Sequence, residues 1–343
     1  MFAPKYNISN KLLANIKKVA EITTELNSRR FSFVVLAEFE KKAREISTYS
    51  SVSIEGNPLP LTEVRQILKT KPEYIRDSEK EILNYNKALS ELNEYIKEKK
   101  YDFDLSLLLK IQKSITQSLI DKYRCGRIRK EPVFVNDPRT SRTIYLPPNH
   151  DDVPDMLTEL LKYIKQNEGK IDPLILAGIF HKQFVIIHPF IDGNGRTARL
   201  GTKALLAKMG LNTFNLFSFE NYYNKNVGRY FQQVGVMGNY YDFQNDIDFT
   251  EWLEYFTDGI IDELLRVKKE LELETNLSKK SISEYQNKII WYVKENGSIS
   301  DKEYAKITDR ARATRSLDLK RLVEAGEIKR VGHGRATYYQ LNY

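Results

Sequence analysis

The feature that most constrains this chain is a helical repeat of apolar residues that covers most of its 343 residues. Residues 9 to 120 contain successive amphipathic segments such as "SFVVLAEFEKKAREIS" and "DSEKEILNYNKALSELNEYIKEK", and the repeat returns in "DVPDMLTELLKYIKQ" and "PLILAGIFHKQFVII". Apolar residues spaced three and four apart are typical of helices packed on a core. The pattern predicts a mainly α fold, in two or three domains for a chain of this length.

One stretch breaks the helical pattern. In "EPVFVNDPRTSRTIYLPP", two β-branched or aromatic runs, residues 133–135 and 143–146, flank the turn cluster Asn136-Asp137-Pro138. Such runs around a turn are typical of a β-hairpin. We therefore expect a short hairpin between helices.

A second change of pattern begins near Ser283. "EYQNKIIWYVKENG" predicts a helix that ends at Gly297, "SDKEYAKIT" a helix capped by Ser300, and "RARATRSLDLKRLVEAG" a helix that ends at Gly326. "EIKRVGHGRATYYQLN" predicts two short strands around a Gly-His-Gly turn. Three helices followed by a hairpin is the order of a winged helix-turn-helix.

The composition excludes several classes of site. Cys125 is the single cysteine, so neither an intrachain disulfide nor a thiol metal cluster can form. The first residues lack a continuous apolar segment and no apolar run reaches about eighteen residues, so we expect a cytoplasmic protein that does not enter a membrane. The net charge of +8 suits an anionic ligand or partner.

The segment "HPFIDGNGRTAR", residues 188–199, predicts a phosphate-binding loop. His188 precedes Pro189, which disfavours helical geometry, so this histidine should lie at the end of one helix. Residues 192–195 form a short glycine-rich turn that opens the next helix. Unpaired amide groups and the helix dipole at such a turn favour a bound phosphate.

The charged residues of this segment fit the same chemistry. Arg196 and Arg199 lie three apart on the helix, so both could reach one polyphosphate. Asp192 offers a hard oxygen ligand for Mg²⁺, and a neutral His188 could accept a proton from a hydroxyl. Taken singly, each group has a structural explanation: a turn, a solvated arginine pair, or a buried histidine such as His181. The combination favours the phosphate site.

The same segment resembles the signature of the Fic family, His-x-Phe-x-Asp/Glu-Gly-Asn-Gly-Arg-x-x-Arg, at every signature position. The resemblance implies a nucleotidyltransferase in which His188 deprotonates a target hydroxyl, which attacks the α-phosphorus of ATP and expels pyrophosphate. It also implies that Asp192 holds Mg²⁺, while the backbone of Gly193, Asn194 and Gly195, together with the Asn194 side chain, forms the anion hole.

By the same resemblance, Arg196 contacts the β-phosphate, Arg199 contacts the γ-phosphate, and Phe190 is an apolar anchor. Further along, "YNKNVGRYF" is similar to the family's stretch near the adenine. Asn226 matches that stretch, whereas Val227 replaces an arginine.

The resemblance covers most of residues 30 to 260. It implies that the hairpin near residues 133–146 is a flap whose edge aligns an extended segment of a target protein by strand addition. The tip "NDPRTSR" lacks the glycine pair that is common in relatives.

"SSVSIEGNPLP", residues 50–60, is a second segment of interest. Ser51 and Glu55 lie four apart on one helix face, before a helix stop at Gly56. Spacing alone favours a surface helix end with a solvated glutamate. The resemblance of Ser-x-x-x-Glu-Gly to the inhibitory motif of Fic proteins implies instead that Glu55 pairs with Arg199 where the γ-phosphate should lie, so that ATP binds unproductively.

These segments imply a division of the chain. We expect an N-terminal helical region over residues 1–105 that carries the inhibitory helix (about 35–56), a Fic catalytic core over 106–265, a linker helix over 266–282, and a winged helix-turn-helix over 283–343.

The last of these regions is basic, with 12 Lys or Arg against 8 Asp or Glu. The basic residues on the expected recognition helix, its approach and the wing are Arg310, Arg312, Arg315, Lys320, Arg321 and Arg335. This charge pattern favours binding to duplex DNA. A docking or dimerisation role stays open, because a fold does not establish a function.

The sequence thus predicts a self-inhibited protein adenylyltransferase that moves AMP from ATP to a Ser, Thr or Tyr hydroxyl of a target protein or of itself. Two alternatives stay open: a de-AMPylating enzyme in which Glu55 positions a water, and a DNA-binding regulator whose Fic domain senses nucleotide. Phosphotransfer is less favoured, because kinase-like relatives carry a lysine where this chain has Gly195. The target, the activating signal and the oligomeric state, a homodimer included, stay open.

Overall fold

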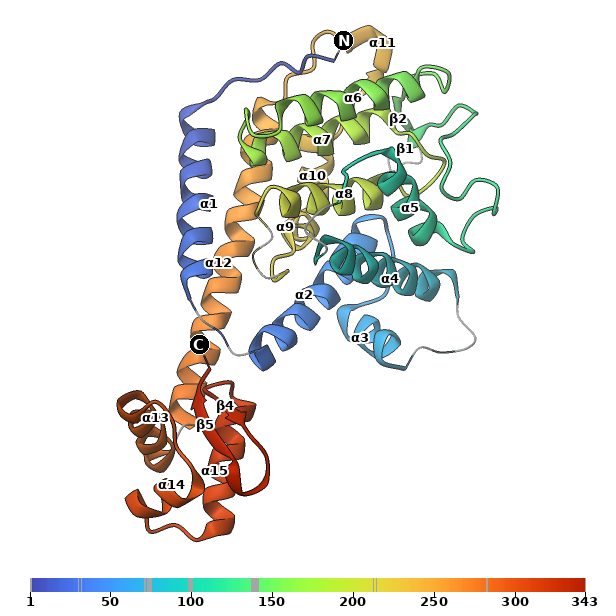
Figure 1. The fold of residues 1–343 in the computed structure, drawn as a ribbon. Coiled ribbons are helices and arrows are strands. Elements are labelled where there is room, and N and C mark those ends of the chain that lie inside the picture. Colours follow the sequence, from blue (N-terminus) through green and yellow to red (C-terminus); the bar gives the residue numbers. More distant parts are fainter. Residues whose placement is uncertain are drawn as a thin grey trace. The chain divides into compact units, whose positions relative to one another are not determined.

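The computed structural model describes residues 2–29, 31, 33–70, 72, 76–97, 101–136, 142–211, 213, 215–281 and 283–342. The chain forms two compact units, of which the first comprises Met1–Leu26 and Lys42–Leu265 and the second Asn27–Lys41 and Arg266–Tyr343 (Figure 1). Helices dominate both units, so the predicted mainly α fold is confirmed.

The helices of the first 281 residues are α1 (Asn10–Ser28), α2 (Phe33–Ile54), α3 (Leu61–Thr70), α4 (Asp77–Lys97), α5 (Leu105–Thr116), α6 (Val153–Asn167), α7 (Pro173–Ile187), α8 (Asn194–Lys208), α9 (Phe219–Lys225), α10 (Val227–Val234), α11 (Tyr240–Phe243) and α12 (Thr250–Ser281). Asp104 caps α5 by accepting a hydrogen bond from the Leu107 amide, and Asp172 caps α7 in the same way through Leu174.

Helices α7 and α8 form the centre of the first unit. In α7, 13 of 15 residues are buried, and in α8, 12 of 15 are buried. Apart from His181, Lys182 and Gln183, helix α7 is apolar, and a helix with apolar residues on all sides is stable only when protein surrounds it. Helix α8 packs against α7, α5 and α4 (Figure 1). The connection between α7 and α8 is therefore held at both ends by the most buried helices.

The hairpin that the sequence predicts is present in the described residues as β1 (Val135–Asn136) and β2 (Thr143–Leu146), which pair antiparallel. A third strand, β3 (Gly238–Asn239), pairs parallel with β2 and gives the order β1-β2-β3. Strand β2 is therefore bonded on both sides, and the outer edge of the sheet on the hairpin side is β1. The expected tip at residues 137–141 lies outside the described residues.

The C-terminal part of the second unit, the C-terminal module (residues 283–342), has the expected element order. It contains α13 (Glu284–Asn296), α14 (Asp301–Ile307), α15 (Arg312–Glu324), β4 (Ile328–Val331), the short 3₁₀ turn Gly334–Ala336 and β5 (Tyr338–Leu341). Gly297 takes a left-handed conformation after α13, with φ of 79°, and Ser300 caps α14. The apolar core of the module consists of Ile289, Val293, Ile299, Tyr304, Leu319, Leu322 and Ile328.

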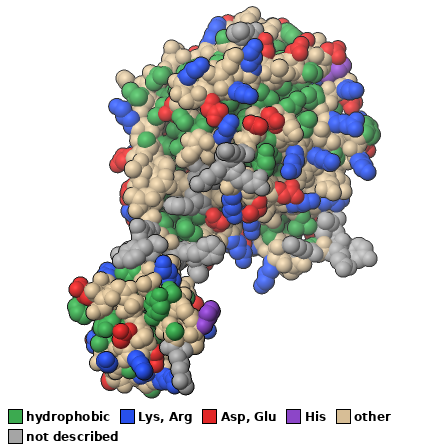
Figure 2. Space-filling model, in the orientation of Figure 1, with side chains coloured by type: hydrophobic (Ala, Val, Ile, Leu, Met, Phe, Trp, Pro, Cys, Tyr) green, Lys and Arg blue, Asp and Glu red, His purple; other side chains and the backbone are tan. Residues whose placement is uncertain are grey.

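The surface shows no large field of one charge on the face seen in Figure 2, where Lys and Arg side chains are interspersed with Asp and Glu. None of the helices in the described ranges combines the length and the apolar content that a membrane span requires.

Candidate functional site

The candidate site is the loop between α7 and α8. His188 ends α7 in a left-handed conformation, with φ of 50° and ψ of 58°. The side chain of Asn194 closes the loop, because its Oδ1 accepts from the Phe190 amide (2.9 Å) and its Nδ2 donates to the Phe190 carbonyl (2.8 Å). From α5, Gln112 Nε2 donates to the Asp192 carbonyl (3.1 Å).

Asn194 therefore shapes the loop through its side chain, whereas the sequence placed that side chain in the anion hole. The first hydrogen bond of α8 runs from the Thr197 amide to the Gly193 carbonyl (2.8 Å). Amides earlier in a helix have no intrahelical acceptor and remain available to an anion.

Gly193 satisfies a steric requirement. It caps α8 in a left-handed conformation with φ of 82°, and a Cβ at this position would lie 3.0 Å from Cδ1 of Ile115 and 3.1 Å from Cγ2 of Thr116. A side chain here would be strained by the backbone and crowded by α5.

His188 is prepared to accept a proton. Its Nδ1 lies 3.1 Å from the Val185 carbonyl, and since a carbonyl can only accept, the proton resides on Nδ1 and Nε2 keeps its lone pair. Burial lowers the pKa of His188 below its usual 6.5, and the guanidinium of Arg129 lowers it further, against the raising effects of the Val185 carbonyl and two carboxylates. The imidazole is therefore neutral at neutral pH.

Arg196 is held by two carboxylates. Its Nη2 donates to both oxygens of Asp192 (2.9 Å each), and its Nη1 donates to Oε1 of Glu81 on α4 (2.5 Å). Burial acts to lower the pKa of this guanidinium, but the two carboxylates raise it above its usual value. Glu81 has no signal in the sequence, because it lies on an ordinary amphipathic helix.

Arg199 is fully buried and binds α2 and the residue that follows it. Its Nε donates to Oγ of Ser51 (2.8 Å), and its Nη2 donates to the Ser51 carbonyl (2.9 Å) and to Oε1 of Glu55 (2.7 Å). Burial acts to lower the pKa of Arg199, and the Glu55 carboxylate raises it above its usual value. Glu55 is an exposed residue at the surface, as spacing alone predicts, but its side chain is 27% exposed and its carboxylate pairs with Arg199 rather than only with solvent.

Glu55 also lies directly against the loop. A Cβ added to Gly195 would collide with Oε1 of Glu55 and would lie 3.1 Å from Nη1 of Arg199. The space over Gly195 is therefore shared by the carboxylate and the guanidinium. Arg196 and Arg199, which the sequence expected on one polyphosphate, here pair with different carboxylates.

Two further residues bear on the predictions. Asn226 is exposed and caps α10 by accepting from the Arg229 amide (3.0 Å), so its contact with adenine stays a prediction. His181 is buried between the Tyr230 hydroxyl and Thr202 Oγ1, at 3.0 Å from each, in agreement with its structural interpretation.

In the C-terminal module, two arginines of the predicted recognition surface are bound internally. Arg310 pairs with both oxygens of Asp318 (2.7 and 2.9 Å), and Arg315 pairs with Asp301 (3.0 and 3.1 Å). Both residues lie where the sequence places them, on α15 or its approach, but each is held by a carboxylate of the module. The exposed basic residues of α15 are Arg312, Lys320 and Arg321, and the side chain of Arg335 lies outside the described residues.

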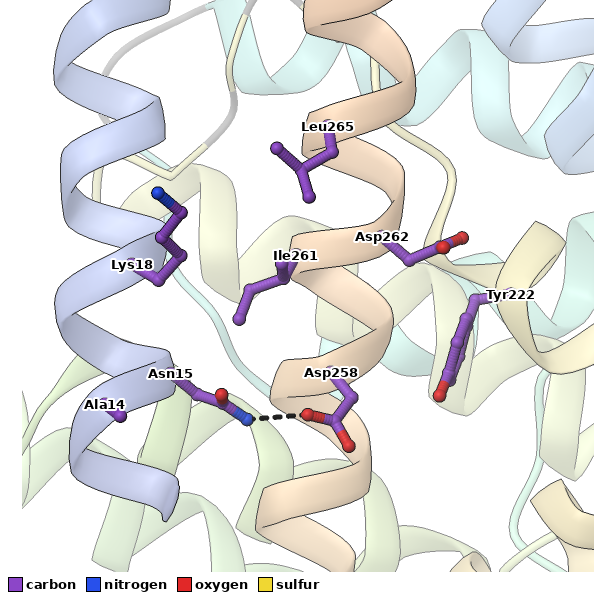
Figure 3. Close-up of a pocket in the computed structure, with 8 residues that line it drawn as sticks. All are labelled: Ala14, Asn15, Lys18, Tyr222, Asp258, Ile261, Asp262 and Leu265. Atoms are coloured by element: carbon purple, nitrogen blue, oxygen red, sulfur yellow. Dashed lines mark hydrogen bonds between the residues drawn. The ribbon is translucent and has the colours of Figure 1, made fainter. Parts of the chain in front are cut away.

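A groove of about 600 Å³ lies elsewhere in the first unit, lined by α1, α9 and α12 (Figure 3). Asn15 Nδ2 donates to Asp258 there (2.8 Å). Lys11 also pairs with Asp258 (2.8 Å), and Lys225 pairs with Asp262 (2.6 Å). Since the chain's own lysines neutralise these carboxylates and none of the predicted site residues line the groove, it does not compete with the loop as a candidate site.

Comparison with known proteins shows that the part of the chain around this loop matches one family model. Residues 102–206 match the model of the Fic/DOC family. The chain is similar to the protein adenylyltransferase Fic of Aedes aegypti, with 28% identity over 220 residues that cover 59% of this chain and 42% of that protein. The chain spans less than half the length of the curated relatives that it matches.

Solved structures share the fold. A Fic family protein from Desulfovibrio desulfuricans superposes with a TM-score of 0.64 at 20% identity, covering 99% of this chain and 98% of that chain. A Fic domain containing signaling protein from Bacteroides thetaiotaomicron gives a TM-score of 0.61 at 20% identity, covering 74% of this chain and 95% of that chain.

Proposed function

We propose that this chain, which contains a Fic domain over residues 102–206, is a self-inhibited protein adenylyltransferase. It transfers AMP from ATP to a Ser, Thr or Tyr hydroxyl of a target protein or of itself. The observation that carries the proposal is a neutral histidine, His188, with a free Nε2, one short loop from a helix N-terminus and two buried arginines. Relatives named protein adenylyltransferase Fic support the same chemistry.

The reaction balances on the groups of this loop. The target hydroxyl oxygen attacks the α-phosphorus, its proton passes to Nε2 of His188, and the bond to pyrophosphate breaks so that pyrophosphate leaves with the electron pair. Transfer of this kind depends mostly on positioning and on neutralisation of charge. The first amides of α8, Arg196 and Arg199 supply these two effects.

The residues also fit Mg²⁺. The carboxylate of Asp192 is 42% exposed, and Mg²⁺ in nucleotide sites commonly takes one or two carboxylates together with substrate phosphates. Bound there, the ion would neutralise phosphate charge. Residues in the described part of the chain form no group of three or more metal-ligating side chains, so a purely protein-bound metal is not part of the proposal.

Self-inhibition rests on the Glu55–Arg199 ion pair at 2.7 Å. A γ-phosphate that reaches Arg199 must displace the Glu55 carboxylate, which occupies the space over Gly195. Removing one member of a buried pair is costly, but a second anion can replace the carboxylate without leaving the guanidinium unpaired. With Glu55 in place the triphosphate is shifted, and its α-phosphorus is no longer in line with the attacking oxygen.

The strand order of the hairpin and the charges of the C-terminal module support two proposals about binding partners. We propose that a target protein adds a strand at the outer edge of β1, beside the exposed Phe134. For the C-terminal module the proposal is duplex binding through Arg312, Lys320 and Arg321, with protein docking as the alternative. The free, partly buried Cys125 suits the cytoplasm, where thiols stay reduced.

The test is transfer of label from α-labelled ATP by a Glu55→Gly variant, with Mg²⁺ and a cell lysate. We expect self- and target-labelling to rise about 10²-fold over wild type, since a misplacement of about 1 Å can cost that factor. Glu45→Gly is a control, because Glu45 lies on α2, which ends just before Glu55, and pairs with Arg65 (3.1 Å) rather than with Arg199.

Arg199→Ala in the Glu55→Gly background should abolish the increase in labelling, because no guanidinium is then present to bind the γ-phosphate. Equal labelling by wild type and Glu55→Gly would refute self-inhibition. An absence of labelled protein in every variant would refute adenylyl transfer itself.

A further inference from the structure

Arg129 is a buried arginine that the proposed chemistry does not use. It lies between α5 and β1 and is only 3% exposed. Its Nε donates to the His188 carbonyl (2.8 Å), its Nη1 to the Glu131 carbonyl (3.2 Å), and its Nη2 to the Pro148 carbonyl (2.5 Å). Its backbone amide donates to the Pro189 carbonyl (2.9 Å).

The partners of this guanidinium are unusual for a buried charge. Burial lowers the pKa of Arg129, and the acceptors recorded for it in the described part of the chain are backbone carbonyls rather than a carboxylate. Burying a charge without an ion pair is costly, so the hydrogen bonds from the guanidinium to the three carbonyls must offset that cost. A planar fork of five N–H donors suits three acceptors from three segments, which a lysine could not satisfy.

Two of these bonds fix the backbone that carries the proposed base. His188 adopts a left-handed conformation, which costs a residue with a Cβ about 1 kcal/mol or more unless the surroundings impose it. The carbonyls of His188 and Pro189 both accept from Arg129, through its side chain and its backbone respectively. Arg129 thus stabilises the turn from which the imidazole projects.

The third bond reaches the hairpin. Pro148 follows β2 by two residues, and its carbonyl accepts from the same guanidinium. A parallel link runs from the Tyr145 hydroxyl of β2 to the Ile186 carbonyl at the end of α7 (2.8 Å). The hairpin strand and the residues after it are therefore joined to the end of α7 and the start of the loop by two buried side chains.

We propose that Arg129 is a positioning residue that locks the hairpin to the backbone of His188, so that a target hydroxyl aligned on the hairpin meets the imidazole in one fixed geometry. This inference rests on the proposed adenylyl transfer. Arg129 touches neither nucleotide nor target, and acts by holding together the two elements that present the hydroxyl and the base.

Arg129 also acts on the pKa of His188, which a residue with only a structural role would leave unchanged. Besides burial, the charges that act on His188 are Arg129, which lowers its pKa, and Glu55 and Asp192, which raise it, together with the Val185 carbonyl. Removing the positive charge of Arg129 should therefore raise the pKa of His188. Because the base must be neutral, the acid limb of the pH–rate profile should move to higher pH.

The experiment compares Arg129→Gln, Arg129→Lys and the control Arg127→Gln, all in the full chain with Glu55→Gly. Arg127 is exposed and two residues away. For Arg129→Gln we expect kcat to fall about 10²-fold with the Kd for ATP unchanged, and the pKa of His188 to rise. Arg129→Lys keeps the charge but not the fork, so kcat should fall while the pKa stays. The control should match its parent.

The pKa is measured by NMR titration of ¹⁵N-histidine-labelled protein, which contains only 4 histidines, with His188→Ala to assign the signal. If Arg129→Gln leaves both kcat and the titration unmoved, the proposal is wrong. If Arg129→Gln does not fold, Arg129→Lys decides, and a kcat equal to the parent overturns the proposal. If the Glu55→Gly parent transfers no AMP, the proposed function fails, while the titration still decides whether Arg129 acts on His188.

Discussion

The loop and first turns of α8 (residues 188–199) and the C-terminal module both pair arginines with carboxylates, but the two regions bury different partners of those pairs. Arg199 pairs with Glu55, whose side chain is 27% exposed and lies against the loop. Arg310 pairs with Asp318, whose side chain is 2% exposed and also accepts from the Tyr304 hydroxyl (2.9 Å). We propose that the first pair exchanges its carboxylate for another anion, whereas in the second pair the carboxylate is the buried partner.

The two pairs differ in which partner is buried: Arg199 is 0% exposed and Glu55 27%, whereas Arg310 is 26% exposed and Asp318 2%. Glu55 follows the end of α2 and contacts Arg199 at the rim of a helix N-terminus, where an incoming phosphate has its own donors. Asp318 lies inside α15, and Arg310 additionally stacks over the Tyr285 ring at 3.9 Å. A spacing of arginines alone therefore says nothing of which are available to a ligand.

The largest expected effect is on AMP transfer, which should depend on the loop and not on the C-terminal module. In the Glu55→Gly background, His188→Ala should lower transfer by about 10²–10⁴-fold, because loss of a general base costs that much. Calorimetry should give an unchanged Kd for ATP, since the phosphate contacts come from other groups. Arg312→Ala in the C-terminal module is the control and should leave transfer intact. Transfer by His188→Ala at the parent's rate would remove the histidine from the mechanism.

The pH dependence sharpens the same contrast. Burial and Arg129 hold the pKa of His188 below 6.5, so the base is neutral and active above that pKa. As the pH falls through it, the imidazole takes up a proton and transfer by Glu55→Gly should drop about tenfold per pH unit, with the acid limb below pH 6.5. A rate profile from pH 5 to 8 measures this. An acid limb above pH 7 would contradict the role of burial.

The loop could be predicted from the sequence because its determinants are contiguous. Pro189 after His188 ends α7, and Gly193 supplies the left-handed residue with φ of 82°. Glu81 and Arg129 could not be predicted, since each lies about 60 or more residues away on a segment without a motif, and only packing brings them to the loop.

Local patterns also explain which elements were found. The helices of the C-terminal module were predicted because Ser300 and Gly297 are a typical helix start and stop. Strand β3 was missed, because Gly238 and Asn239 carry no β-branched signal and pair with β2 only through the fold. The internal pairing of Arg310 was missed for the same reason, since Asp318 is buried by its neighbours rather than by its own residue type.

A thermal-shift experiment on the two ion pairs tests the comparison itself. Glu55→Gly and Asp318→Ala each leave a partner unpaired, so each should lower a melting temperature by several degrees. ATP should recover stability in Glu55→Gly by more than in wild type, because the γ-phosphate replaces the carboxylate on Arg199. ADP should not, and Asp318→Ala should respond to ATP as wild type does. An equal response of Glu55→Gly to ATP and ADP would break the distinction between the pairs.

The smallest expected effect concerns the basic residues that remain exposed on α15. If Arg312, Lys320 and Arg321 contact phosphates, the logarithm of affinity for a duplex should fall linearly with the logarithm of salt, with a slope of up to about −3 for three contacts. Arg312→Ala should reduce that slope by about 1 and weaken binding to all sequences alike. Fluorescence anisotropy of the full chain with a labelled duplex, between low and physiological salt, measures both.

Arg310→Ala is the variant to compare with Arg312→Ala in this salt titration, because Arg310 differs from Arg312 in its surroundings and not in its charge. Bonded to Asp318 and stacked on Tyr285, it should leave the salt slope unchanged while lowering the melting temperature of the C-terminal module. An equal loss of slope in both variants, without a loss of stability in Arg310→Ala, would show that Arg310 is free for a ligand as Arg312 is. An absence of binding even at low salt would leave protein docking as the function of the C-terminal module.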